Sequence, residues 1–468
     1  MDNIVPVFYS EYGRYISRFR MIPLDIDAMI PVNRRLLLTM HRIARKTTKS
    51  ARIVGELIGT LHAHGDNAAY NSLVNLVREG FADDSKSTWG GPGLIDAEAP
   101  AQRYTETNIL PWVDKFAFEY INYVPWESLE LDDEPLYLPS IVPIGLIGKG
   151  VHVGLAYHKT VIPKFKKQDL VRRLIWLLKI GNKYKVPEDF SKSLPELDCG
   201  PKIAPYKDDC DVVEDEENAF LKILMLGEGK VLYRPKLLLN EGKTIKLEIL
   251  GRSPLATFQS LLNDYSKNLL PFTDKPIDQS KKSIKITATL KRTVDIDEFI
   301  PDFREKYLNK SINFKCYFCN LDGVVKQYSI DNILINCFNK WRVASINKLI
   351  NDVQIINSKI INNKICTEIR NIIHKHPTLK SVDELINLFD FSVTQVVQVF
   401  DAESNMWTCQ DIKITNDDVK NVCQNVNIQK LIEYKSIEEK LIEEFNKIKH
   451  NIDNYDQFVI SVLKENLK

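Results

Sequence analysis

The sequence predicts an α+β protein made of several domains. Its 468 residues are enough for two to four separate hydrophobic cores, and a composition of 44% hydrophobic and 27% charged residues is ordinary for a globular chain. Apolar residues recur at helical spacing between positions 30 and 80, alternate with a period of two within 242–292, and return to helical spacing after about 330. These three blocks are the basis for the domains predicted below.

Three short helices are expected in the first block. The one within 31–49 has an apolar stripe of Val32, Leu36, Met40 and Ile43 and a second face formed by Arg35, Arg42, Arg45, Lys46 and Lys49. The next is expected to open at Ser50, a good N-cap residue, and the third at Asp66. Short helices with a basic face are typical of helix-turn-helix and winged-helix DNA-binding modules.

The distribution of charge also favours a polyanionic partner. The net charge of +1 hides a stretch from Arg14 to Arg52 with ten Lys and Arg residues against only Asp25 and Asp27. A solvated basic face without a ligand is the alternative interpretation. Neither Asp25/Asp27 nor Asp295/Asp297 has an obvious third carboxylate on a nearby strand, so we expect both pairs to be solvated turn acids.

Strands, turns and long helices are expected further along the chain. GKTIKLEILG (242–251) and KKSIKITATLKR (281–292) alternate as half-buried strands do. Seven of the ten residues from Asp208 to Glu217 are acidic, which favours a solvated boundary there. Apolar spacings of three and four at 334–360 and 434–455 predict two antiparallel helices of coiled-coil type, with 365–430 as a smaller helical knob.

Several short motifs resemble binding sites. HAHGD at 62–66 matches the start of the HxHxDH pattern of metallo-β-lactamase-like hydrolases, but position 67 is Asn, and the favoured interpretation places a histidine and a helix N-terminus beside a phosphate. GEGK at 227–230 is too short for a nucleotide-binding loop of the GxxxxGK[ST] type. Cys316 and Cys319 form a single CxxC pair, which we interpret as core thiols, and no metal site is predicted.

The sequence RYTE at 103–106 follows a Gly- and Pro-rich loop, WGGPGLIDAEAPAQ, that we expect to be mobile. A phenol, with an ordinary pKa near 10, is a poor nucleophile at neutral pH unless a base or cations stabilise its phenolate. Arg103 provides a fixed cation beside Tyr104 and could bind a phosphate. This pair has the chemistry needed to break and rejoin a phosphodiester.

These motifs occur in the order found in the breakage-reunion part of type IIA DNA topoisomerases, the family of the gyrase and topoisomerase IV A subunits. YSEYGRYISRFRMIPLDIDAMIPVNRR, KSARIVGELIGTLHAHGD and AQRYTE resemble the family's opening segment, its histidine block and its catalytic Arg-Tyr. EPLYLPSIVPIGLIGKGVHVGLA, GEGKVLYRPKLLLNEGKTIKLEILGRSP and KPIDQSKKSIKITATLKR extend the match to residue 292. Beyond 330 the resemblance is one of architecture only.

The resemblance implies three domains. Residues 1–165 would form a winged-helix, breakage-reunion domain with the catalytic tyrosine, and 166–325 an α/β tower domain. Residues 326–468 would form a long antiparallel coiled coil and a C-terminal helical dimer gate. Little sequence follows the last predicted helix, so we expect no β-pinwheel and no supercoiling by wrapping.

The resemblance also implies the roles of individual residues. Tyr104 would form a 5′-phosphotyrosyl link with Arg103 stabilising the transition state, Arg20 would be the active-site arginine, and His64 would hydrogen-bond at the reacting phosphate. Val151 occupies the position of an apolar wedge that bends DNA. The expected DNA-binding residues are Arg34, Arg35, Arg42, Arg45, Lys46, Lys49, Asn67 and Val151. The chain departs from the family in its shorter loop, at Ile30 where a Lys is common, and at Asn67 and Asn71.

The expected partners follow from the same resemblance. They are double-stranded DNA, a second copy of the chain, and a B-type ATPase/TOPRIM subunit that completes a heterotetramer and binds Mg²⁺ and ATP. No apolar run is long enough for a membrane span and no signal peptide is evident, so we expect a cytoplasmic, DNA-associated protein. The B-type half would be either a second polypeptide or a missing N-terminal region. The Asn, Ile and Lys content, the short C-terminus and the start at Met1 favour a separately encoded subunit, for example from a phage or another virus. The alternatives are a DNA-bending paralogue that does not cut DNA and a metal-dependent hydrolase centred on HAHGD.

Overall fold

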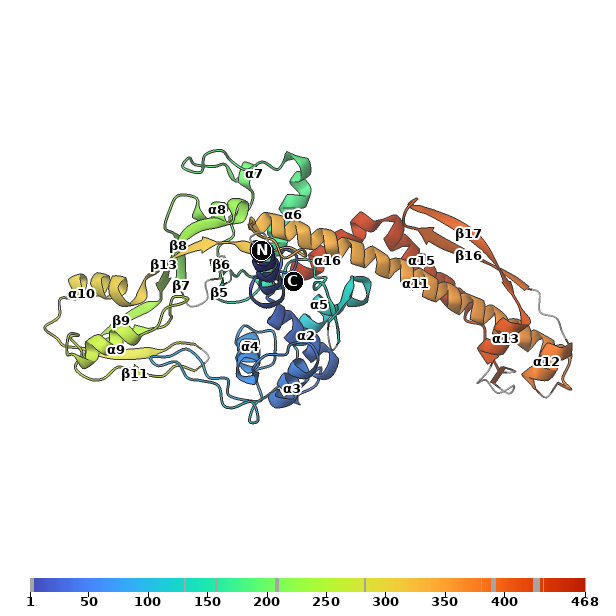
Figure 1. Ribbon diagram of the computed structural model, residues 1–468, viewed down its shortest axis with the longest axis horizontal. Helices are drawn as coiled ribbons and strands as arrows, with labels where there is room; N and C mark the ends of the chain where they lie inside the picture. Colours follow the sequence, from blue (N-terminus) through green and yellow to red (C-terminus); the bar gives the residue numbers. More distant parts are fainter. Residues whose placement is uncertain are drawn as a thin grey trace. The chain divides into compact units, whose positions relative to one another are not determined.

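The computed structural model describes residues 4–129, 132–155, 159–206, 210–281, 283–379, 381–388, 393–423, 430–431 and 433–467 (Figure 1). The chain divides into two compact units, residues 1–342 with 465–468, and residues 343–464. Both contain helices and strands, so the predicted α+β class is confirmed at this level. Among the described residues, no helix has both the length and the apolar character needed to cross a lipid bilayer.

The first unit begins with a group of helices. These are α1 (Ile4–Ile16), η1 (Ser17–Met21), α2 (Pro31–Ile43), α3 (Ser50–Thr60) and α4 (Asp66–Arg78). Proline at the first position of α2 suits a helix start, because its fixed φ is helical and its missing N–H would be unsatisfied there in any case. The three predicted helices are confirmed, and Leu36, Met40, Ile53 and Leu73 are fully buried. Ser50 is not the N-cap as expected: it lies inside α3, and its hydroxyl accepts a hydrogen bond from Thr105 Oγ1 at 2.8 Å.

A short ladder joins the helices to the segment that contains RYTE. Strand β1 (Thr48–Lys49) pairs antiparallel with β2 (Glu106–Thr107). The chain then continues through α5 (Pro111–Phe118), η2 (Ile121–Tyr123), the hairpin β3 (Trp126–Ser128) and β4 (Asp133–Pro135), and η3 (Ile144–Leu146). The start of α3 and the residues after Tyr104 are therefore directly hydrogen-bonded neighbours.

A five-stranded antiparallel sheet brings distant segments together in the order β5-β6-β13-β8-β7. Its strands are β5 (Val151–Leu155), β6 (Lys159–Pro163), β13 (Lys310–Lys315), β8 (Glu228–Pro235) and β7 (Cys210–Glu214). The acidic stretch is not the boundary that was expected, because its described part forms an edge strand and the turn after it within one unit. Asp211, Glu214, Asp215 and Glu217 are nevertheless exposed, as the predicted solvation requires. Asp215 pairs with Lys230 across 2.9 Å, which neutralises part of the negative charge.

The GEGK motif lies between a helix and a strand. Gly227 ends α8 (Ala219–Leu226) in the left-handed region at φ +80, and a Cβ there would lie 2.1 Å from the carbonyl oxygen of Tyr328. Strand β8 begins at the next residue. A phosphate-binding loop would instead open a helix at this point, so the sequence-based exclusion of such a loop is confirmed.

A second, four-stranded sheet in the first unit has the order β11-β12-β10-β9. Its strands are β11 (Ile277–Asp278), β12 (Ile286–Leu290), β10 (Ile245–Ile249) and β9 (Leu237–Glu241). Residues of β10 and β12 form a core with α9 (Gln259–Ser266), α10 (Ile296–Phe303) and η5 (Arg304–Leu308). The strands predicted within 242–251 and 281–292 are confirmed. The first unit also contains α6 (Lys167–Ile180), η4 (Gly181–Lys183), α7 (Glu196–Cys199), β14 (Tyr317–Cys319) and β15 (Val325–Gln327).

Most of the second unit is organised around α11 (Ile330–Lys375), whose 46 residues begin in the first unit. Leu349, Val353 and Ile356 of α11 share a core with Leu441, Phe445 and Ile452 of α15 (Glu438–Asp453). Ser345 hydrogen-bonds Tyr455, whereas Asn363 hydrogen-bonds Tyr434 and Ser436, so the two segments run antiparallel as predicted. The second helix starts four residues later than expected, and α16 (Tyr455–Leu467) follows it.

The predicted helical knob at 365–430 is wrong in one respect. Its described residues include α12 (Val382–Leu388) and α13 (Asn416–Cys423), but between them lies a long hairpin of β16 (Val393–Asp401) and β17 (Met406–Ile414). The strand VTQVVQVFD is rich in β-branched residues, and Asn405 takes a left-handed φ of 53 before β17. These local strand and turn signals outweigh the helical spacing of the flanking segments.

A buried ion pair ties α11 to α6 within the first unit. Arg173 donates to both carboxylate oxygens of Asp331, at 2.8 and 2.6 Å, and the two side chains are 0% and 2% exposed. Tyr184 donates to the same carboxylate at 2.9 Å. Burial of both charges is tolerated because Arg173 and Tyr184 satisfy the carboxylate and the guanidinium also donates to the Cys199 carbonyl.

Replacing one partner should therefore destabilise the first unit strongly. Asp331→Ala leaves a buried guanidinium without its carboxylate, so we expect a loss of about 3–5 kcal/mol in the free energy of unfolding. The double change Arg173→Met with Asp331→Leu removes both charges and should cost less. Urea denaturation followed by tryptophan fluorescence measures both, and an Asp331→Ala loss no larger than that of the double variant would contradict this account.

Candidate functional site

The two motifs singled out in the sequence lie side by side. HAHGD forms the turn between α3 and α4, where the His64 N–H donates to the His62 carbonyl at 2.7 Å. At the start of α4, Asp66 Oδ2 accepts a hydrogen bond at 3.2 Å from the side-chain amide of Gln102. Arg103 and Tyr104 come next in the chain. The structure thus places the residues before the tyrosine against the histidine turn.

Tyr104 combines an exposed side chain with a firmly held backbone. Its side chain is 65% exposed, and the guanidinium carbon of Arg103 lies 4.6 Å from the centre of its ring. Thr105, the next residue, is completely buried, and its carbonyl accepts from the Ser50 N–H at 2.9 Å. Its hydroxyl also lies 3.0 Å from the Tyr70 hydroxyl. The exposed phenol of Tyr104 thus stands on a hydrogen-bonded segment of backbone.

The Gly- and Pro-rich loop before the tyrosine makes several specific contacts in the structure, and the mobility expected from its composition stays a prediction. Arg78 of α4 donates to the carbonyls of Trp89 and Ala97, at 3.0 and 3.2 Å. Leu94 is buried in the core of the four-stranded sheet, and its N–H donates to Asp278 at 2.7 Å. Gly90 has a φ of +66, and a Cβ there would lie 2.2 Å from the Ala97 carbonyl oxygen. Specific contacts, rather than glycine flexibility, therefore set the course of this loop.

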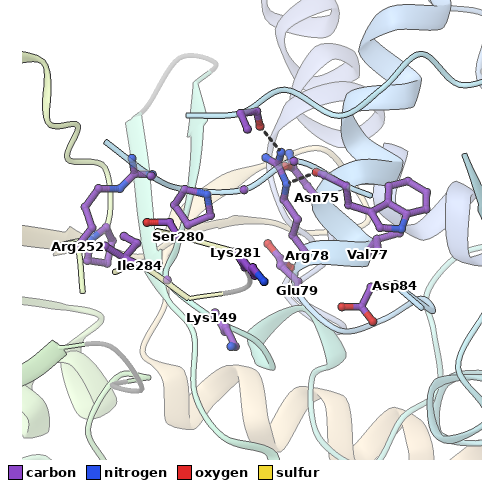
Figure 2. Close-up of a pocket in the computed structure, with 18 of the residues that line it drawn as sticks. Asn75, Val77, Arg78, Glu79, Asp84, Lys149, Arg252, Ser280, Lys281 and Ile284 are labelled. Carbon is purple, nitrogen blue, oxygen red and sulfur yellow. Dashed lines mark hydrogen bonds between the residues drawn. The ribbon is translucent and has the colours of Figure 1, made fainter. Parts of the chain in front are cut away.

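A cavity of about 840 Å³ lies beside the loop (Figure 2). Cations and carboxylates both line it, among them Arg78, Glu79, Lys149, Asp278 and Lys281. Figure 2 shows Arg78 and Asn75 on one side and Arg252, Ser280 and Ile284 on the other. The loop is thus held at opposite rims of the cavity, by α4 and by the segment that contains β11.

His62 and His64 form a stacked pair close to Arg20. Their ring centres are 4.1 Å apart with 10° between the planes. Burial, then the charges of His64, Arg35 and Arg20, lower the pKa of His62 to about 3, and burial together with Arg20 and Arg35 lowers the pKa of His64. Arg20 is exposed at the end of η1. Near neutral pH the site therefore offers uncharged imidazoles beside an exposed guanidinium, a set suited to a phosphate.

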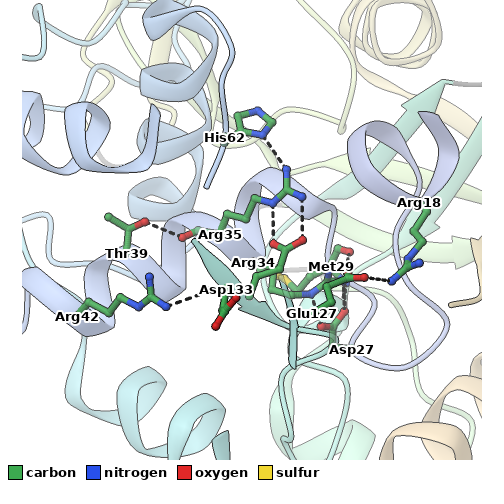
Figure 3. A network of polar contacts seen from close by, with 11 residues as sticks. Arg18, Asp27, Met29, Arg34, Arg35, Thr39, Arg42, His62, Glu127 and Asp133 are labelled. Carbon is green, nitrogen blue, oxygen red and sulfur yellow. Dashed lines mark hydrogen bonds and ion pairs between the residues drawn. The ribbon is translucent and has the colours of Figure 1, made fainter. Parts of the chain in front are cut away.

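Arg34 and Arg35 are not on the DNA-facing surface expected for them. Arg34 donates to both oxygens of Asp27, at 2.7 and 3.1 Å, and Arg35 donates to both oxygens of Glu134, at 2.7 and 2.8 Å (Figure 3). All four residues are at most 7% exposed. Each fork is occupied by a carboxylate, so neither arginine is free to hold a phosphate.

The expectation that Asp25 and Asp27 are solvated turn acids is also wrong. Asp27 is completely buried, and besides Arg34 it accepts hydrogen bonds from the N–H groups of Met29 and Leu138, at 2.9 and 3.0 Å. Asp25 is 9% exposed, and burial raises its pKa. Asp25 and Asp27 are therefore part of the protein interior, although their sequence resembles an exposed turn.

The other basic residues at the end of α2 are exposed. Arg42 pairs with Asp132, Arg45 approaches Asp114 at 3.3 Å, and Lys49 pairs with Glu106, while Lys46 is also exposed. Pairs of this kind at a surface are weak and exchange readily for other anions. Asn67 is exposed in the first turn of α4. Val151 lies elsewhere in the first unit, half-buried at the first position of β5 opposite Pro163.

Sequence reasoning missed the partners that organise the site. Glu134 is 99 residues from Arg35, and Leu138 is 111 residues from Asp27, so no local spacing pairs them. Thr105 and Gln102 are adjacent to the recognised Arg-Tyr pair but carry no special pattern of their own. Among the described residues, no cluster of three or more His, Cys, Asp or Glu side chains is arranged to hold a metal ion. Cys316 and Cys319 are buried free thiols, as predicted.

Comparison with known proteins places the chain in a family. A family model for the A subunits of DNA gyrase and topoisomerase IV matches residues 20–467. The chain belongs to this family. It is 28% identical over 318 residues to the DNA gyrase A subunit of Helicobacter pylori and 30% identical over 330 residues to that of Lawsonia intracellularis. It is 32% identical over 183 residues to the DNA topoisomerase 4 A subunit of Neisseria gonorrhoeae.

The matches cover more of this chain than of its relatives. They include 62%, 65% and 36% of the chain, but only 36%, 38% and 23% of the respective relatives. The chain thus matches less than two fifths of the length of these gyrase and topoisomerase IV proteins. All three relatives are bacterial, so they add nothing in favour of the viral source that the composition suggested.

The stacked histidines predict a pH dependence of stability in this family member. The pKa of His62 is about 3 in the folded chain against 6.5 ordinarily, so the unfolded chain binds more protons between these values. The free energy of unfolding should therefore fall as the pH drops from 6.5 towards 3, by up to about 1.4 kcal/mol per pH unit for one such group. His62→Phe keeps a ring for stacking but cannot titrate. Denaturation curves at several pH values should show a shallower slope for this variant, and an identical slope would contradict the assignment.

Proposed function

We propose that the chain is the DNA-cleaving and rejoining part of a type II DNA topoisomerase, which makes a transient double-strand break through which a second duplex passes. The observation that carries this proposal is Tyr104, whose exposed phenol stands on a buried, hydrogen-bonded backbone with Arg103 against its ring. A residue that served only in packing would not be 65% exposed beside a cation. Membership of the family of gyrase and topoisomerase IV A subunits supports the same chemistry.

The proposed reaction is a reversible transesterification at phosphorus. The Tyr104 hydroxyl gives up its proton to water as its oxygen attacks the scissile phosphate and forms a bond to the phosphorus on the 5′ side of the break. The bond from phosphorus to the 3′ oxygen breaks, and the 3′ oxygen leaves and takes up a proton from water. Arg103 and Arg20 oppose the charge that grows on the phosphoryl oxygens, and His64 hydrogen-bonds at the same phosphate. Attack by the 3′ hydroxyl on the phosphotyrosine reverses each step, so the duplex is restored without a net change in bonds.

The proposed DNA surface is smaller than the one expected from the sequence. It contains the exposed residues Arg42, Arg45, Lys46, Lys49 and Asn67. Arg34 and Arg35 are buried beneath it and are not part of the surface. The charges of the exposed residues would attract the phosphate backbone of any sequence. Val151 is proposed as an apolar wedge that enters the duplex from β5 and bends it.

We further propose the domain roles and partners that the family implies. Residues 1–165 would act as a winged-helix breakage-reunion domain, 166–325 as a tower, and 326–468 as a coiled coil with a dimer gate. Two copies would cut the two strands, and a B-type subunit would complete a heterotetramer. We place the sites for Mg²⁺ and ATP on that partner.

The basic surface predicts how binding depends on salt. Because each phosphate contact releases condensed cations, Arg45→Gln and Lys46→Gln should each lower the slope of log affinity against log salt by about 0.9, with little change in sequence preference. Fluorescence anisotropy with a labelled duplex at several salt concentrations measures the slope. Lys447→Gln, an exposed lysine of the second unit, is the control and should leave it unchanged. Equal slopes for all variants would argue against this surface.

The tyrosine assignment predicts a separation of binding from chemistry. Tyr104→Phe removes one oxygen and leaves the basic surface intact, so duplex binding should persist while covalent attachment disappears. Arg103→Ala should retain residual attachment, slower by roughly 10²- to 10³-fold. The assay traps covalent complexes with detergent, in the presence of Mg²⁺ and a B-type subunit, and maps the labelled peptide.

Tyr9→Phe is the matched control for this experiment. Tyr9 is also 65% exposed, but it lies on α1, and its loss should leave attachment unchanged. Covalent attachment to the Tyr104→Phe protein, or a label on another tyrosine, would refute the assignment. A DNA-bending paralogue predicts instead that wild type binds duplex but never becomes attached.

A further inference from the structure

A chain of contacts leads from Glu134 to His64. Both carboxylate oxygens of Glu134 on β4 accept from Arg35 of α2, at 2.7 and 2.8 Å, and the remaining nitrogen, Nη1, approaches Nδ1 of His62 at 3.1 Å (Figure 3). His62 in turn stacks on His64, with ring centres 4.1 Å apart. Glu134 and Arg35 are 3% and 6% exposed, so solvent does not compete for these bonds.

The contact between Arg35 and His62 selects one tautomer. A guanidinium has donors only, so Nη1 must donate and Nδ1 of His62 must accept. His62 is then uncharged and carries its proton on Nε2. A proton on Nδ1 would break this hydrogen bond, and protonation of both ring nitrogens would in addition set two cations 3.1 Å apart.

His64 is held against this fixed ring. Its N–H donates to the His62 carbonyl at 2.7 Å, and its ring plane is within 10° of parallel to that of His62. Its Nδ1 is buried and has no hydrogen-bond partner among the described residues. A buried N–H without an acceptor is costly, so the proton belongs on Nε2, which is also the nitrogen that remains for a ligand.

We propose that Glu134, Arg35 and His62 are positioning residues, which hold the His64 ring in one orientation and one tautomer with Nε2–H available to the scissile phosphate. This inference rests on the proposed function. Glu134 holds the arginine, the arginine fixes the first imidazole, and the first imidazole supports the second. None of the three touches the reacting atoms; His64 is the residue that does.

The charged groups around the two rings come from three elements. Arg20 lies at the end of η1, Arg35 on α2 and Glu134 on β4. Both arginines oppose protonation of the histidines, and Glu134 balances the charge of Arg35 inside the protein. Removing the Arg35 charge should therefore raise the pKa of His64 towards its ordinary value, so that His64 protonates at a higher pH.

The test removes the arginine and its carboxylate together. Arg35→Met with Glu134→Leu replaces a buried ion pair by apolar groups of similar size, a change that proteins commonly tolerate. The control, Arg18→Met with Glu127→Leu, removes an ion pair of 2.6 Å on the same hairpin, where Glu127 is the register partner of Glu134. If the first variant does not fold, Arg35→Lys is the substitute. It keeps a positive charge beside Glu134 but lacks the guanidinium that also donates to His62, so the His62 ring should again become a mixture of tautomers.

Two readouts are needed, one independent of catalysis. Nitrogen-15 NMR of labelled histidine reports tautomer and titration for the eight histidines. In wild type and control, His62 should remain in the Nε2–H form from pH 6 to 8, whereas in the first variant it should become a mixture and His64 should titrate at a higher pH. The rate of covalent attachment, measured with Mg²⁺ and a B-type subunit, should fall by roughly 10- to 100-fold. In a plot of this rate against pH, the decrease on the acid side (the acid limb) should move to higher pH.

The outcomes separate this inference from the proposed function. A wild-type protein that never attaches to DNA refutes the proposed function and the positioning role with it. Attachment by wild type with an unchanged His62 tautomer in the first variant refutes positioning alone. The same holds for a changed tautomer with an unchanged rate and acid limb, or for a control variant that behaves like the first. The inference stands if tautomer, acid limb and rate change together and only in the first variant.

Discussion

Burial of charge is the constraint on which this site depends. A guanidinium taken out of water is tolerated only if its donors are occupied, and Arg34 and Arg35 meet this requirement with Asp27 and Glu134. Through these bonds α2 is joined to the turn before it and to the β3–β4 hairpin far along the chain. Because Asp27 also accepts from the Leu138 N–H, one carboxylate holds three segments together. The helix that begins the basic surface is therefore fixed from within.

The same constraint shapes the chemistry proposed for the surface. The interior arginine that faces Glu134 also faces the imidazole of His62, whose pKa is lowered mainly by burial and further by the charges of His64 and Arg35. Outside, Arg20 and Arg103 remain exposed and near the histidines and the tyrosine, respectively. In the proposed reaction, the buried Arg35 orients an imidazole, whereas the exposed Arg20 and Arg103 meet phosphate.

The segment that contains the tyrosine likewise combines a buried residue with an exposed one. Thr105 is buried and bonded to Ser50, while the adjacent Tyr104 is open to solvent. The loop before it is fastened by Arg78 and by Asp278, so the histidine turn, the loop and the four-stranded sheet share hydrogen bonds. In the second unit, the β16–β17 hairpin packs against α11 and α15. Its strands were not predicted, because the sequence on either side has helical spacing.

Elements that depend on local pattern could be predicted from the residues alone. Helical spacing located α2, α3 and α4, period-two alternation located β10 and β12, and the motifs HAHGD and RYTE located the candidate site, because such signals lie within a few residues of one another. Which charges are exposed depends instead on contacts between distant segments. Arg34 and Arg35 look the same as Arg42 and Arg45 in the sequence, yet carboxylates up to 99 residues away place the first two in the core. The course of the loop likewise depends on a distant partner, Asp278, which lies 184 residues from Leu94 and which no local spacing encodes.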